Sequence, residues 1–211
     1  MLGRQRLLNS SRKFSTGLIA LNVICLVLIG IVSTVPDWVS LHPHHSEDEF
    51  SGNLYQVTRG EKIQHSLYTD LKDKYCDESD DFSKAACSTF STLVDAHEVY
   101  WTYLGIGCAA IVAKMLILLI QCCIFNCSFL LIPASIVTMV CCPLAIFMYD
   151  KTADLVYHGT CTDFNHGDEP GSLCAEIGPH FSIALSFGIV VVGVFEIIVT
   201  VHSLLLSLIH I

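Results

Sequence analysis

The sequence predicts an all-α membrane protein, a four-helix transmembrane bundle that carries a small, disulfide-stapled extracellular β-sheet. Three observations predict this class: 53% hydrophobic residues with a mean hydropathy of +0.59, four long apolar segments, and a long polar segment with two cysteines between the first two of them. This composition is too apolar for a soluble domain of 211 residues. The net charge of −9 also argues against a nucleic-acid-binding surface. The composition therefore predicts an integral membrane protein.

Four segments are long enough to serve as membrane spans. A helix needs about 20 mostly apolar residues to cross a hydrocarbon core of about 30 Å. The segments that meet this requirement are 17–35, 99–123, 128–148 and 181–206. The apolar part of the first segment exceeds the roughly 7–15 residues of a signal-peptide core, so we expect it to persist as a helix. We treat 1–211 as a single tetraspan domain.

Basic residues set the expected orientation in the membrane. The arm before the first span carries basic side chains and no acidic ones, at Arg4, Arg6, Arg12 and Lys13. Positive charge beside a span favours the cytosolic side, which places the N-terminus, and after four spans also the C-terminus, in the cytosol. The loops 36–98 and 149–180 then lie outside, and the first of them holds 13 acidic and 5 basic residues. We expect a multi-pass protein of the plasma membrane.

Four of the 11 cysteines lie in the expected exterior loops, where disulfides persist. Cys76 and Cys87 share the first loop, and Cys161 and Cys174 share the second. Pairing within each loop is the shortest-range choice, although four cysteines allow three pairings. Another group lies at the expected cytosolic turn: Cys122, Cys123 and Cys127. Juxtamembrane cysteines are common palmitoylation sites, and inert thiols are the alternative interpretation.

The first loop is too long for a simple connection and contains three β-prone segments. These segments are 38–41, 53–57 and 62–68, and each alternates polar residues with strand formers. They predict a small extracellular sheet. Residues 88–98 are expected to extend the second span outside the membrane. A Cys76–Cys87 disulfide would add roughly 2–4 kcal/mol to so small an exterior fold.

These features together resemble the claudin and peripheral-myelin-protein superfamily of tetraspan proteins. The resemblance is carried by the cytosolic N-terminus, the large first loop, Trp38 just after the first span, and Leu67-Tyr68 ahead of the cysteine pair. Claudins have a Trp, then Gly-Leu-Trp, then two bonded cysteines. Here Ser66-Leu67-Tyr68 stands for Gly-Leu-Trp, and the first cysteine follows eight residues later rather than about three.

The second-loop cysteines resemble those of the lipoma-fusion-partner-like tetraspans more than those of claudins. That branch, with the receptor and calcium-channel regulatory proteins of the same superfamily, implies an auxiliary subunit of an ion channel or receptor, contacted laterally and through the extracellular sheet. The alternative is a claudin-type junction protein that self-associates. Its acidic exterior would favour cations at a paracellular path. An acidic cluster near the first disulfide could concentrate cations, meet a basic partner, or form a soluble face without a specific ligand: Asp70, Asp73, Asp77, Glu78, Asp80 and Asp81.

Lys114 and Glu196 are the charged residues within the predicted spans. Each costs about 2.5–3.5 kcal/mol at the centre of a helix unless it is paired or hydrated. Both lie at a similar depth, because each is 15 residues from the exterior start of its span. The sequence leaves two interpretations open. The first is a buried ion pair; in the second, Lys114 extends to the cytosolic surface while Glu196 is protonated or faces a partner helix.

The remaining patterns are less specific. Small residues allow close approach of helices, whether within the bundle or against a partner: Gly105, Gly107, Ala109, Ala110, Ala113, Gly188 and Gly193. No spacing matches a catalytic nucleophile, a cofactor motif or a defined metal site. We therefore expect a non-enzymatic protein without catalytic residues, cofactor or metal, surrounded by membrane lipid.

Overall fold

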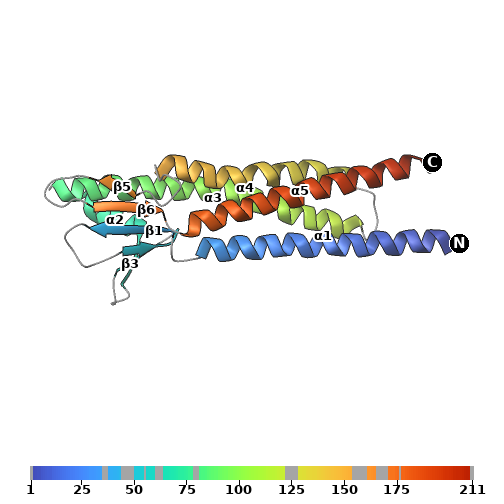
Figure 1. The fold of residues 1–211 in the computed structure, drawn as a ribbon, viewed down its shortest axis with the longest axis horizontal. Coiled ribbons are helices and arrows are strands. Elements are labelled where there is room, and N and C mark those ends of the chain that lie inside the picture. Colours follow the sequence, from blue (N-terminus) through green and yellow to red (C-terminus); the bar gives the residue numbers. More distant parts are fainter. Residues whose placement is uncertain are drawn as a thin grey trace. The chain divides into compact units, whose positions relative to one another are not determined.

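A computed structural model describes five α-helices and six strands (Figure 1). The described residues are 2–34, 38–43, 50–54, 56–59, 64–77, 81–121, 128–153, 161–164, 171–175 and 177–209. The helices are α1 Leu2–Thr34, α2 Tyr68–Cys76, α3 Asp81–Gln121, α4 Leu131–Ala153 and α5 Ile177–Ile209, with a short 3-10 turn at Ser128–Leu130 ahead of α4.

Four of these helices are long and apolar enough to cross a membrane, which confirms the number of predicted spans. The apolar segments are Ser15–Thr34, Cys87–Ile120, Leu131–Thr152 and Gly178–Leu205. The helices continue beyond the predicted spans. In particular, α1 includes the basic arm, and α3 includes the predicted extension at 88–98. These properties are those of a multi-pass membrane protein.

Both predicted loops contribute to one antiparallel sheet. The strands are β1 Val39–Pro43, β2 Phe50–Gly52, β3 Gln56–Arg59, β4 Gln64–Leu67, β5 Cys161–Phe164 and β6 Gly171–Ala175. Their order is β4-β3-β2-β1-β6-β5, so β1 pairs with β6 and joins the two loops. The strands of the second loop were missed from the sequence, because four or five residues without polar–apolar alternation give too weak a pattern.

The chain divides into two compact units. The first comprises 1–29, 103–143 and 185–211, and the second comprises 30–102 and 144–184. The first unit is a bundle formed by parts of α1, α3, α4 and α5. Its apolar core includes Leu18, Leu118 and Leu131. The second unit contains the sheet, α2, and the remaining turns of the long helices.

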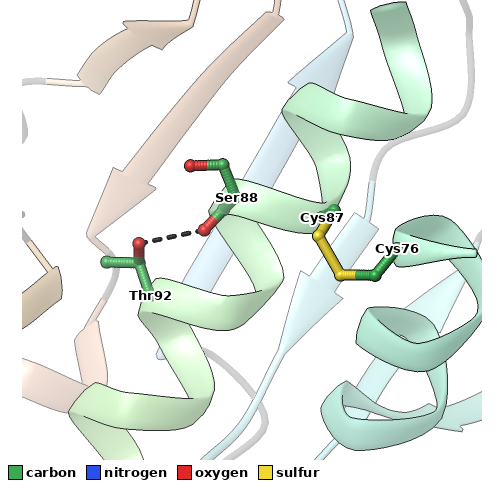
Figure 2. The surroundings of a disulfide bond; sticks show 4 residues. All are labelled: Cys76, Cys87, Ser88 and Thr92. Carbon is green, nitrogen blue, oxygen red and sulfur yellow. Dashed lines mark hydrogen bonds between the residues drawn. A yellow bond between two sulfur atoms is a disulfide. The ribbon is translucent and has the colours of Figure 1, made fainter. Parts of the chain in front are cut away.

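The Cys76–Cys87 disulfide lies in the second unit and joins α2 to α3 (Figure 2). Cys76 is the last residue of α2, and its Cα lies 4.8 Å from that of Cys87. One turn further along α3, the Thr92 hydroxyl donates a 2.9 Å hydrogen bond to the Ser88 carbonyl (Figure 2). The structure contains the Cys76–Cys87 disulfide that the sequence predicts, and both of its cysteines lie on helices. Strand β4 runs directly into α2, so the bond fixes that edge of the sheet to α3.

Candidate functional site

Four polar side chains, one from each long helix, meet inside the bundle of the first unit. We call this group the polar centre: Asn22 of α1, Lys114 of α3, Ser135 of α4 and Glu196 of α5. None of the four residues is more than 2% exposed. Because a span offers no water to its buried polar groups, each group needs a partner inside the protein.

Glu196 is the residue that the other three contact. Its Oε2 atom accepts hydrogen bonds from Lys114 Nζ and from Ser135 Oγ, each at 2.8 Å. Its Oε1 atom accepts one from Asn22 Nδ2 at 2.5 Å. The second Asn22 amide hydrogen bonds to the Leu18 carbonyl, one turn earlier on α1, at 2.9 Å. One carboxylate thus connects all four helices.

The structure brings Lys114 and Glu196 together as the ion pair that the sequence left as one of two interpretations. A buried ion pair offsets its desolvation cost only when further hydrogen bonds satisfy the charges, and Asn22 and Ser135 supply two of these. Neither Asn22 nor Ser135 was predicted from the sequence as a site residue. Asn22 interrupts an otherwise apolar span, which is a detectable signal for a functional position. Ser135 gave no such signal, because hydroxyls are common in membrane helices.

Glycines bring the helices close enough to form the polar centre. A Cβ atom at Gly193 of α5 would lie 2.3 Å from Met139 Cγ of α4, and one at Gly107 of α3 would lie 2.5 Å from Cys142 Sγ of α4. Both distances are far below van der Waals contact. A larger residue at either position would force the side chain of Met139 or Cys142 to move. Gly193 lies three residues before Glu196 on α5.

Other small residues take no part in this packing. Gly105 of α3 and Gly188 of α5 have no atom within 4 Å of the place where a Cβ would lie. Ala109 and Ala113 follow Gly105 at four-residue intervals on α3, and all three are exposed. The structure thus separates the small residues that pack the bundle from those on its outer surface, a distinction that the sequence did not allow.

The second unit has an aromatic core, the aromatic cluster, formed by Trp38, Tyr68, His97, Tyr100 and Tyr149. Trp38 is fully buried and donates a 2.9 Å hydrogen bond from Nε1 to the Val32 carbonyl near the end of α1. Its ring meets those of Tyr100 and Tyr149 edge-on, each with centroids 5.3 Å apart. The residue that carries the sequence motif is therefore a structural centre of this unit.

Gly178, at the start of α5, allows this position of Trp38. A Cβ at Gly178 would lie 2.5 Å from Trp38 Cδ1. Tyr68, which was also singled out by the motif, is buried at the start of α2, and burial raises the pKa of its hydroxyl. For Leu67 the structure describes the backbone alone, at the end of β4.

The remaining candidate residues differ in how far the structure describes them. Cys161 of β5 and Cys174 of β6 are direct register partners, so the backbone places the two positions opposite each other, and their disulfide stays a prediction. Cys122, Cys123 and Cys127 lie outside the described residues. Of the acidic cluster, Asp70, Asp73 and Asp77 are exposed on and just after α2. Within the described ranges, no group of three or more metal-ligating side chains forms a metal site.

Comparison of the chain with known protein families finds no family model that matches, and comparison with curated proteins also finds no match.

Proposed function

We propose that this protein is a non-enzymatic auxiliary subunit of an ion channel or receptor in the plasma membrane, and that it modulates the assembly, trafficking or gating of its partner. The observation that carries the proposal is the outer surface of α3 at Gly105, Ala109 and Ala113, where small side chains are exposed and no packing within the bundle uses them. Small residues at four-residue spacing let a second membrane helix approach closely.

The polar centre supports the same proposal from the inside of the bundle. Its ion pair is buried and hydrogen-bonded to both neighbouring helices, so the bundle can hold its own shape while one face packs on a partner. The outward residues beside the stripe are apolar, for example Ile106, Val112 and Leu116 on α3. A partner would therefore meet van der Waals packing rather than charge.

We infer that the sheet lies outside the cell and that both termini are cytosolic. The basic arm at the start of α1 supports this orientation. The Cys76–Cys87 disulfide supports it independently, because disulfides persist in oxidising compartments. The extracellular sheet is then available as a second contact to the exterior domain of a partner.

The resemblance of the sequence to the claudin and peripheral-myelin-protein superfamily also supports a binding role rather than catalysis. Trp38 and the Leu67-Tyr68 pair carry that resemblance. The cysteines of the second loop favour the branch of channel and receptor subunits over the junction proteins.

A claudin-type junction protein is the second candidate function. The exposed carboxylates of Asp70, Asp73 and Asp77 favour it, because a negative surface raises the local concentration of cations at a paracellular path. In that case the chain would self-associate in strands between cells instead of joining a different membrane protein.

The test is purification of the tagged chain in mild detergent, followed by mass spectrometry of the proteins recovered at fixed stoichiometry. We expect a channel or receptor subunit. A Gly105→Leu variant should lose that partner, whereas Gly17→Leu should retain it, because Gly17 lies on α1 and likewise has no atom within 4 Å of a Cβ. Recovery of this chain alone, assembled in polymeric strands, would contradict the proposal and favour the junction protein.

A further inference from the structure

His97 occupies an unusual position for a titratable residue. It lies on α3 and is 7% exposed, within the aromatic cluster. Its ring stacks on that of Tyr149 of α4, with centroids 5.6 Å apart and planes 7° apart, and lies 4.9 Å from that of Tyr68 of α2. Its Nε2 atom has no hydrogen-bond partner among the described residues. The Nε2 edge of the imidazole is therefore buried without a polar partner.

The rings around His97 also hold the first strand of the sheet. Tyr149 contacts both His97 and Trp38. The backbone amide of Trp38 donates a 2.8 Å hydrogen bond to the Gly52 carbonyl at the end of β2, and β1 begins at the next residue. A continuous series of contacts thus runs from His97 through Tyr149 and Trp38 to the centre of the sheet.

We propose that His97 makes the attachment of the sheet acid-sensitive: protonation of its imidazole loosens the stacked aromatic cluster and with it the contacts of Trp38, the residue that precedes β1. The structure is suited to the neutral ring, because a charged imidazolium would be buried without a counter-ion. Attraction between the imidazolium and the faces of the tyrosine rings offsets only part of this cost.

The groups that surround His97 also favour the neutral imidazole over the charged one. The facing residues of α2 and α4, Tyr68 and Tyr149, are neutral phenols. On α3 itself, the carboxylates nearest in sequence belong to Asp95 and Glu98, and both residues are exposed.

The parts of α4 and α5 in the second unit also carry charged and titratable residues. On α4, Asp150 is half-buried and Lys151 is exposed, and on α5, His180 is exposed. No ion pair to His97 forms within the described part of the chain.

The sign of the pH dependence follows from these contacts. The unfolded chain solvates an imidazolium freely, whereas the folded cluster disfavours it, so the unfolded state binds the proton more readily. Stability is therefore complete above the ordinary titration of histidine, near pH 6.5, and falls as the pH is lowered. One proton changes the opening equilibrium by up to about tenfold per pH unit.

Protons can reach this part of α3 from water. The apolar part of α3 contains 34 residues, which at about 1.5 Å per residue exceeds a hydrocarbon core of about 30 Å. The excess lies at the end that carries Asp95 and Glu98, because the other end is uninterrupted by acidic residues. His97 thus belongs to the end of the helix that extends into the aqueous phase.

The test compares hydrogen exchange of the β1 amides in the full chain with that in a His97→Phe variant, in lipid nanodiscs at pH 7.5 and pH 5.5. Comparison at equal pH cancels the intrinsic pH dependence of exchange. We expect equal protection at pH 7.5, and about tenfold faster exchange of β1 in the unmodified chain at pH 5.5. His202→Phe is the matched control, because His202 is exposed on α5, and this variant should behave as the unmodified chain.

Equal exchange of the unmodified chain and the His97→Phe variant at both pH values would overturn the proposal. A difference that His202→Phe also removes would overturn it too. If the phenylalanine variant shows no protection at pH 7.5, His97→Gln replaces it, because glutamine also removes the titration, and the same comparison then applies.

Discussion

Asn22 and Glu196 are 174 residues apart in the sequence, and the amide of the first donates a 2.5 Å hydrogen bond to the carboxylate of the second. This contact joins the first membrane helix to the last. Lys114 and Ser135 add the second and third helices through the other oxygen of the same carboxylate. A single acidic side chain therefore determines which faces of the four helices meet, a specification that apolar packing alone leaves open inside a lipid bilayer.

Asn22→Leu should lower the free energy of unfolding by about 1.5–3 kcal/mol, because it removes a hydrogen bond to a buried charge. Unfolding of the purified protein in detergent, followed by fluorescence, measures the change. Val23→Leu is the control, since Val23 is the next residue on α1 and points outward with 45% exposure. Equal stability of the two variants would show that the Asn22 contact contributes nothing.

Gly193→Ala should destabilise the bundle, while Gly188→Ala should leave it unchanged or slightly more stable. The added methyl at position 193 would collide with Met139, whereas the one at position 188 meets no atom within 4 Å. Overpacking of this kind costs typically about 1–3 kcal/mol. The two variants carry the same chemical change on the same helix, so thermal unfolding isolates the effect of the contact. Similar melting temperatures would contradict the close approach of α4 and α5.

Gly178→Ala and Trp38→Phe should each destabilise the second unit, and their effects should not add. The alanine methyl would press on the indole, and phenylalanine would leave the Val32 carbonyl without its indole donor. In the double variant the smaller ring makes room for the methyl, so we expect a coupling of about 0.5–3 kcal/mol between the two positions. Four unfolding measurements give this coupling. Strict additivity would mean that Gly178 and Trp38 do not touch.

Cys76→Ser should lower the stability by about 3 kcal/mol, the loop-closure contribution expected for cysteines separated by 11 residues. Cys87→Ser should have the same effect, and the double variant should be no worse than either single one. A buried free thiol such as Cys25, substituted by alanine, serves as the control for loss of a cysteine elsewhere. Separate, additive losses at positions 76 and 87 would contradict the bond.

The sequence predicted the helices of this fold better than the contacts between them. Hydropathy located the four spans, since a long apolar segment can be satisfied only as a membrane helix. It also singled out Lys114 and Glu196, because charges in such segments are rare. Whether Lys114 and Glu196 form an ion pair depends on how α3 and α5 are rotated about their own axes. In lipid, the pattern of apolar residues along a helix carries little information about this rotation.

The aromatic cluster shows a different limit of sequence reasoning. Trp38 and Tyr68 were singled out from a motif, yet nothing in the sequence connected them with His97 or Tyr149, which come from separate helices. Gly178 gave no signal either, because a glycine near the start of a helix is common. The strands β5 and β6 were missed for a similar reason: β5 pairs with β6, and β6 pairs with β1, which lies more than 100 residues away, and short strands acquire their conformation from pairing.

The Lys114–Glu196 ion pair holds the helices of the bundle together, and a double-mutant cycle tests this role most directly. Lys114→Met and Glu196→Gln are measured singly and together by unfolding in detergent. Each single variant leaves one uncompensated buried charge, with losses of about 3–5 kcal/mol, whereas the double variant leaves no buried charge. We expect the double variant to be at least as stable as the less stable single variant. Additive losses would contradict it.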